Sequence, residues 1–102
     1  MDFDAYTEAA KRTMNPSLDA RDRVLDAAAG LSEESAEVLG LVRKKVFQGR
    51  DVDPSRLIEE LGDALWCLAI TADSLGTSLD EIARANVEKL RRRHPNGFGG
   101  TA

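Results

Sequence analysis

Two groups of carboxylate side chains carry most of the chemistry that this sequence could perform. They lie in Glu33-Glu34-Ser35-Ala36-Glu37 and in Glu59-Glu60-Leu61-Gly62-Asp63. Residues three or four apart share one face of a helix, so each segment would present neighbouring carboxylates. Their repulsion destabilises a helix by a few tenths of a kcal/mol per pair. A cation between two such faces would offset it, and ligation by several carboxylates favours Mg²⁺ or Mn²⁺.

Two solvated acidic faces are the alternative explanation, because charged runs on helices usually face water. The occurrence of both groups in one chain, with Gly62 between Glu60 and Asp63, argues against it. Apolar neighbours place the carboxylates at the edge of a core or inside a bundle: Leu31, Val38 and Leu41 beside the first group, and Leu57, Leu61 and Leu65 beside the second. Gly62 costs about 1 kcal/mol in a helix interior. We interpret it as room for close approach between the two helices.

Apolar residues recur at spacings of three and four, and strand-like alternation is absent. The pattern predicts an all-α chain of four helices. The first is expected from about Asp2 to Met14, before the break at Asn15-Pro16-Ser17. The second is expected from Asp19 or Ala20 to Phe47, with Gly30 marking a kink or a short break.

The remaining two helices are predicted from their capping residues. Asp53 followed by Pro54 is typical of a helix start, and Gly76 is well placed just after the end of this third helix. A capping box over Ser78-Leu79-Asp80-Glu81 opens the fourth helix, which runs to about Arg93.

The predicted third helix is apolar around much of its circumference from Ala64 to Ala72. Such a helix needs cover on more than one side, which four short helices in one chain supply poorly. We therefore expect a four-helix bundle completed by homo-oligomerisation. Residues 1–98 are expected to form a single domain, and residues 99–102 a flexible tail.

Composition narrows the functional classes. The chain has 102 residues, of which 42% are hydrophobic and 31% charged, as in a one-domain globular protein. A net charge of −4 argues against nucleic acid as the main partner. No apolar run approaches the ~20 residues of a membrane span, and the N-terminus lacks signal-peptide features, so we expect a cytoplasmic protein. With one cysteine, Cys67, and one histidine, His94, an internal disulfide is excluded and a zinc site is disfavoured.

At the carboxylate segments the sequence resembles the MazG-type nucleotide pyrophosphohydrolases, of the all-α NTP pyrophosphatase superfamily. That family carries Glu-Glu-x-x-Glu on one helix and Glu-x-x-Asp on the next, here Glu33 to Glu37 and Glu60 to Asp63. A third segment is similar to the family's closing Asn-x-x-Lys-Leu, Arg-Tyr-Pro and Gly-Phe pattern: Asn86-Val87-Glu88-Lys89-Leu90 and Arg93-His94-Pro95-Asn96-Gly97-Phe98. Histidine stands where tyrosine is common. The resemblance covers about residues 20 to 98.

The resemblance implies Mg²⁺-dependent hydrolysis of nucleoside triphosphates (NTP or dNTP) to the monophosphate and pyrophosphate, with Mn²⁺ as a possible substitute. It implies that Glu34, Glu37, Glu60 and Asp63 hold the metal. Glu33 and Glu34 are the implied catalytic residues, Glu33 by contacting a second ion or by helping to activate the attacking water. A homodimer or homotetramer with sites at subunit contacts is implied as well.

Basic residues near the chain's end are candidates for binding the triphosphate. Asn86, Lys89 and Arg93 match the family's phosphate contacts and share one face of the last predicted helix. Lys89 offers a point charge and Arg93 a bidentate fork, although cations near a helix C-terminus also complement its dipole. Lys44 and Lys45 are further candidates, or an ordinary solvated helix end.

Recognition of the base is less defined by the sequence. Trp66, three residues after Asp63, is the best stacking candidate, ahead of Phe3, Tyr6 and Phe47. A helix aromatic is more often part of the core, which is the alternative for each of them.

Two other functions are open. Phosphoribosyl-ATP pyrophosphohydrolase of histidine synthesis shares the metal chemistry, but the context of Trp66 and the closing pattern from Asn86 to Phe98 favour the MazG type. A non-catalytic helical dimerisation or regulatory module is the other alternative. The presence of every expected metal ligand argues against it.

Overall fold

A computed structural model describes residues 1–99 of the chain as four helices. These are α1 (Phe3–Lys11), α2 (Ala20–Phe47), α3 (Pro54–Ser74) and α4 (Leu79–Arg93). No strand occurs in this part of the chain, so the all-α prediction is confirmed for it. None of the four helices combines the length and apolar character that crossing a membrane requires. Residues 100–102 of the expected tail lie outside the described residues.

Capping side chains set the helix starts where the sequence predicts them. Asp2, Asp19, Asp53 and Ser78 occupy the N-cap positions, and each side chain accepts a backbone N–H two or three residues further on, at 2.8 to 3.1 Å. Gly76 follows the end of α3 with a φ of 78°, a left-handed conformation that glycine adopts without strain. The predicted end of α3 is therefore confirmed.

The first helix is shorter than predicted. It ends at Lys11 and not at Met14, because the backbone after Lys11 forms a turn whose hydrogen bonds go to the carbonyl of Ala10. That oxygen accepts both the backbone N–H of Thr13, at 3.0 Å, and the Thr13 hydroxyl, at 2.8 Å. A threonine side chain that bonds a nearby carbonyl competes with continued helix in this way.

Two further details differ from the sequence-based expectation. α2 runs without interruption through Gly30, so the short break predicted there as one of two alternatives does not occur. The capping box of α4 is half formed: Ser78 accepts the Glu81 N–H, but the Glu81 carboxylate accepts the hydroxyl of Thr77 at 2.5 Å and does not return to Ser78.

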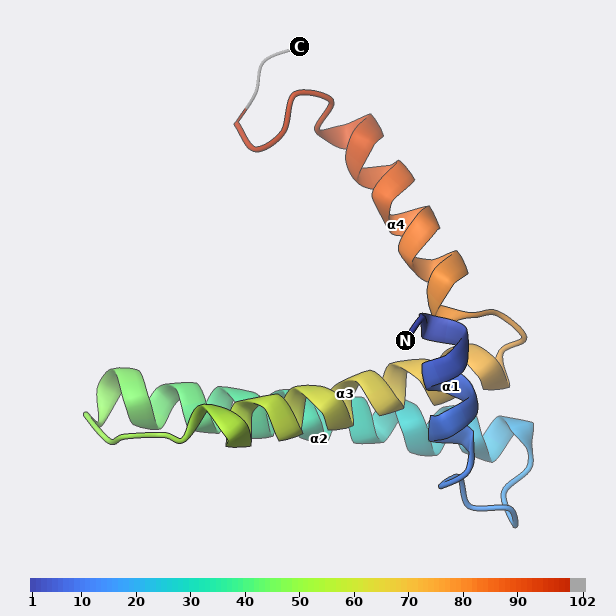
Figure 1. The fold of residues 1–102 in the computed structure, drawn as a ribbon, viewed down its shortest axis with the longest axis horizontal. Helices are drawn as coiled ribbons and strands as arrows, with labels where there is room; N and C mark the ends of the chain where they lie inside the picture. Colours follow the sequence, from blue (N-terminus) through green and yellow to red (C-terminus); the bar gives the residue numbers. More distant parts are fainter. Residues whose placement is uncertain (100–102) are drawn as a thin grey trace.

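The long helices α2 and α3 form an antiparallel pair and make the most extensive contact in the molecule (Figure 1). α1 packs against α3 near one end of this pair. α4 projects away from it and contacts α1 and α3, but within residues 1–99 it does not contact α2. Leu79, the first residue of α4, is the buried residue of that helix.

One hydrophobic cluster draws a buried residue from each of α1, α2 and α3. Its buried members are Ala10, Ala27 and Ile70, against which Tyr6, Met14 and Trp66 pack. The other buried apolar residues of the described chain are Leu41, Cys67, Ala69, Ala72 and Leu79. No large side chain is fully buried in the described chain. An ion pair of 3.5 Å between Lys11 Nζ and Asp73 Oδ1 also joins α1 to α3.

The chain is extended for its size. Its radius of gyration is 16.6 Å, whereas a compact domain of this length has about 13 Å. Large apolar side chains that remain more than half exposed include Leu25, Leu39, Val46, Phe47, Ile58, Leu61 and Leu75. Exposed apolar surface on this scale is typical of chains that pack against other chains. Homo-oligomerisation stays a prediction that this shape favours.

Candidate metal centre

Three carboxylates from α2 and α3 converge on one point. Glu34 comes from α2, and Glu60 and Asp63 come from successive positions on one face of α3. One oxygen of each lies within 4.8 Å of the other two. Glu34 and Glu60 are half-buried and Asp63 is exposed. The structure thus brings together three of the four residues that the resemblance implies as metal ligands.

Glu37, the fourth implied ligand, lies outside this group of three. It is exposed on α2, one helical turn after Glu34. Its negative charge nevertheless contributes to raising the pKa of Glu34. Glu37 is therefore near enough to influence the centre electrostatically without sharing the same point.

Glu34 is the most perturbed carboxyl of the centre. Its pKa is raised to about 7, first by a hydrogen bond with the Glu60 carboxyl, then by removal from water, and then by the charges of Glu60, Asp63 and Glu37. Its Oε2 is buried and has no hydrogen-bond partner within residues 1–99. A bound cation would satisfy this oxygen and offset the repulsion. The all-carboxylate donor set fits a hard divalent ion such as Mg²⁺.

A cavity of about 300 Å³ opens beside the carboxylates. Its α2 side carries Asp26, Glu33 and Glu34, and its α3 side carries Asp63, Trp66 and Cys67. Glu33, the predicted catalytic residue, is exposed and so lies within reach of a molecule in this cavity. The cavity therefore brings Glu33, two carboxylates of the candidate centre and the Trp66 ring together in one place.

Asp26 is a cavity residue that the sequence reasoning missed. It precedes Glu33 by seven residues and Glu34 by eight, which is two helical turns on the same face of α2. That spacing was visible in the sequence, but the Glu-Glu-x-x-Glu pattern does not extend to it.

The indole ring of Trp66 is fixed at its N–H edge by hydrogen bonds, and the residue lines the cavity. Its Nε1–H donates to Thr13 Oγ1 at 2.8 Å and to the Ala10 carbonyl at 3.2 Å. Tyr6 packs in the same cluster, and its pKa is raised by burial and by the charges of Asp63 and Cys67. Phe47 is 82% exposed at the end of α2. Of the aromatic candidates, Trp66 is the one that lines the cavity.

The predicted triphosphate contacts on α4 are separated from the carboxylates within one chain. Asn86, Lys89 and Arg93 are exposed on a helix that does not contact α2 within the described residues. Lys45 is exposed on α2, about 16 Å along the helix axis from Glu34. The structure of one chain therefore does not bring these cations to the centre.

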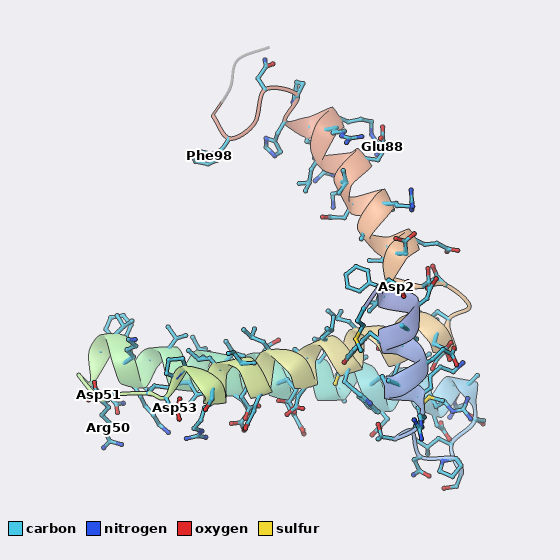
Figure 2. All side chains as sticks on the ribbon, in the orientation of Figure 1. Asp2, Arg50, Asp51, Asp53, Glu88 and Phe98 are labelled. Carbon is cyan, nitrogen blue, oxygen red and sulfur yellow. The ribbon has the colours of Figure 1, made fainter. Side chains whose placement is uncertain are left out.

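The candidate cations fall at two distant places. Lys44 and Lys45 precede the loop that carries Arg50 and Asp51, at the far end of the α2–α3 pair (Figure 2). Glu88 marks the projecting α4, which lies well away from that loop (Figure 2). A site that combined the carboxylates with the basic face of α4 would need residues from a second chain.

Comparison with known proteins places the centre within a recognised sequence pattern. The model of the MazG nucleotide pyrophosphohydrolase domain matches residues 24–98, which include all three converging carboxylates. The uncharacterized protein YvdC of Bacillus subtilis is 40% identical over 73 residues, covering 62% of this chain and 68% of that protein. No solved structure matches the chain.

Proposed function

The chain belongs to the MazG nucleotide pyrophosphohydrolase domain family, and we propose that it hydrolyses nucleoside triphosphates to the monophosphate and pyrophosphate. The observation that carries the proposal is the convergence of Glu34, Glu60 and Asp63 from two helices. The unpartnered, buried Oε2 of Glu34 supports it, because an isolated carboxylate oxygen in that position is costly without a cation.

The carboxylates would serve as the metal-binding side of the active site. Glu34, Glu60 and Asp63 would hold the ion, with Glu37 as a further ligand one turn along α2. When bound, Mg²⁺ would neutralise charge on the phosphoryl oxygens and lower the pKa of a water. Glu33, exposed at the cavity, would accept the proton of the attacking water.

Attack would take place at the α-phosphorus. The oxygen of water forms a bond to that phosphorus, and the bond from it to the oxygen bridging to the β-phosphorus breaks. Pyrophosphate leaves with that bridging oxygen. Lys89 and Arg93 would bind the leaving pyrophosphate oxygens, Lys89 as a point charge and Arg93 as a bidentate fork. Asn86 and Lys45 would add weaker phosphate contacts.

Because α4 lies apart from the carboxylates within one chain, we propose that the active form is a dimer or a tetramer. In one chain the basic face of α4 and the acidic centre do not meet. We propose that a second copy brings them together and covers the exposed apolar side chains of α2 and α3. Trp66 would stack on the nucleotide base within the cavity.

Hydrolysis in ¹⁸O-labelled water tests the point of attack. With Mg²⁺ and a nucleoside triphosphate, the proposal expects one ¹⁸O atom in the monophosphate and unlabelled pyrophosphate, measured by mass spectrometry. Label in the pyrophosphate would show attack at the β-phosphorus and contradict the proposed mechanism. Phosphoribosyl-ATP in the same assay separates the histidine-pathway alternative, which requires that substrate to be turned over fastest.

A further inference from the structure

A glycine brings α2 and α3 into tight contact beside the carboxylate centre. A Cβ added at Gly30 would lie 3.0 Å from the Sγ of Cys67. Ordinary contacts between carbon atoms are about 3.5–4.0 Å, so a methyl group fits there only if its neighbours shift by a few tenths of an ångström. Cys67 is only 5% exposed, so any movement of its sulfur must take place among packed neighbours.

The contact is specific to this position. Gly40 and Gly62 also lie inside helices, but a Cβ at either would meet nothing within 4 Å. The interpretation of Gly62 as the residue that permits close helix approach is therefore wrong. Gly30, interpreted from sequence as a kink or a break, is the glycine at which the two helices come close together, and it lies in an uninterrupted helix.

The Gly30–Cys67 contact is one helical turn from the carboxylates on both helices. Because α2 and α3 run antiparallel, four residues onward from Gly30 leads to Glu34, and four residues back from Cys67 leads to Asp63. Three residues in the other direction lead to Ala27 and Ile70, both buried in the core. The contact thus links the core to the point where the carboxylates converge.

We propose that Gly30 is a positioning residue for the metal centre: its lack of a side chain lets α2 approach α3 until Glu34, Glu60 and Asp63 can share one cation. The inference rests on the proposed metal-binding function. Ligand geometry must be held to within about 0.5 Å for a site to work. A methyl group at Gly30 would require the Cys67 sulfur or the helices themselves to shift by a few tenths of an ångström, which is on that scale.

A competing explanation is that Gly30 only leaves space in the cavity, which it also lines. In that case a methyl group would obstruct the nucleotide and leave metal binding unchanged. Binding of Mn²⁺ alone, without nucleotide, separates the two explanations. Electron paramagnetic resonance of free Mn²⁺ titrated with the metal-free protein measures this affinity directly.

The experiment compares the wild type with Gly30→Ala, Cys67→Ala and the double variant. Gly30→Ala should weaken Mn²⁺ binding about tenfold or more, the loss usual for disturbing the support of a metal ligand. Cys67→Ala should bind nearly as the wild type does. The double variant should recover to within about threefold of Cys67→Ala, because Sγ is the one atom that the new methyl meets.

Gly40→Ala is the matched control, since it makes the same change on the same helix in open space. It should leave Mn²⁺ affinity unchanged. Wild-type affinity in Gly30→Ala would overturn the inference, and so would a double variant that binds no better than Gly30→Ala. A wild-type protein that binds no Mn²⁺ would instead overturn the proposed function, and the inference with it.

A second variant covers the case in which Gly30→Ala does not fold, as judged by circular dichroism. Cys67→Val places an extra methyl group at the same contact from the α3 side and leaves Gly30 unchanged. It should also weaken Mn²⁺ binding about tenfold or more. A folded Cys67→Val protein with wild-type affinity would overturn the inference.

Discussion

The indole Nε1–H of Trp66 donates a hydrogen bond to Oγ1 of Thr13 at 2.8 Å. This bond joins α3, at the candidate metal centre, to the turn that ends α1. α1 lies outside the residues that the family model matches, which begin at residue 24. The first helix therefore supports a ring that lines the cavity, although it contributes no residue to the cavity itself.

Replacing Trp66 by phenylalanine tests this support. The variant keeps an aromatic ring and loses the N–H, so the free energy of unfolding should fall by about 1–2 kcal/mol. Urea denaturation followed by circular dichroism measures the loss. Thr13→Val removes the acceptor, and the losses of the two single variants should not add in the double variant. Full additivity would show that the bond does not couple the two residues.

The fluorescence of Trp66 tests whether it stacks on the base. The chain contains one tryptophan, so its emission reports on this ring alone. A nucleoside triphosphate analogue with a methylene group between the α- and β-phosphates should quench the emission in a saturable way in the presence of Mg²⁺. Binding without any change in emission, with affinity followed by calorimetry, would remove Trp66 from the base site.

The raised pKa of Glu34 predicts how the metal-free protein responds to pH. The folded chain holds this proton until about pH 7, whereas the unfolded chain releases it near the ordinary value of 4.5. The contribution of Glu34 to the free energy of unfolding should therefore fall as pH rises from about 4.5 to 7 and then level off. Melting temperatures in EDTA across this range measure it, and Glu34→Gln should remove this part of the pH dependence.

The same proton should compete with the metal. As pH falls below about 7, Mg²⁺ must displace a proton from Glu34, so its affinity should decrease. Calorimetry in two buffers of different ionisation enthalpy would detect the released proton. Mg²⁺ affinity that is constant from pH 5 to 8 would show that Glu34 is not a ligand.

Mixing inactive subunits tests whether one site uses two chains. Asp63→Asn lacks a metal ligand, and Lys89→Ala lacks a proposed phosphate contact, so each alone should be impaired. If α4 of one chain serves the centre of another, co-refolded mixtures should recover up to about a quarter of wild-type activity, since half of the dimers are mixed and each has one intact site. No recovery in confirmed mixed oligomers would place both residues in the same chain's site.

The helices were predictable from sequence because their determinants are local. Asp2, Asp19, Asp53 and Ser78 act on N–H groups two or three residues away, and Gly76 acts on its own backbone conformation. The early end of α1 was not predictable, because it involves bonds around Ala10 that the periodicity does not register.

The candidate site was predictable only where spacing along a helix decides it. Glu34, Glu60 and Asp63 converge as their spacing suggests, but the displacement of Glu37 depends on how the two helices are set against each other. The tight contact between the helices lies at Gly30 and not at Gly62, which the sequence could not show for the same reason. Whether a glycine inside a helix permits a close contact depends on the partner helix: Gly30 has a close neighbour there, whereas Gly62 has none within 4 Å.

Turnover of a panel of the eight common NTPs and dNTPs with Mg²⁺, by the wild type and by Asp63→Asn, tests the central claim most directly. The products are separated as monophosphate, diphosphate, pyrophosphate and phosphate. The account predicts monophosphate and pyrophosphate in equal amounts from the wild type, and a loss of at least about a hundredfold in Asp63→Asn, the upper end of what even indirect disturbance of a metal site costs. Diphosphate and phosphate as products, or undiminished activity in Asp63→Asn, would contradict it.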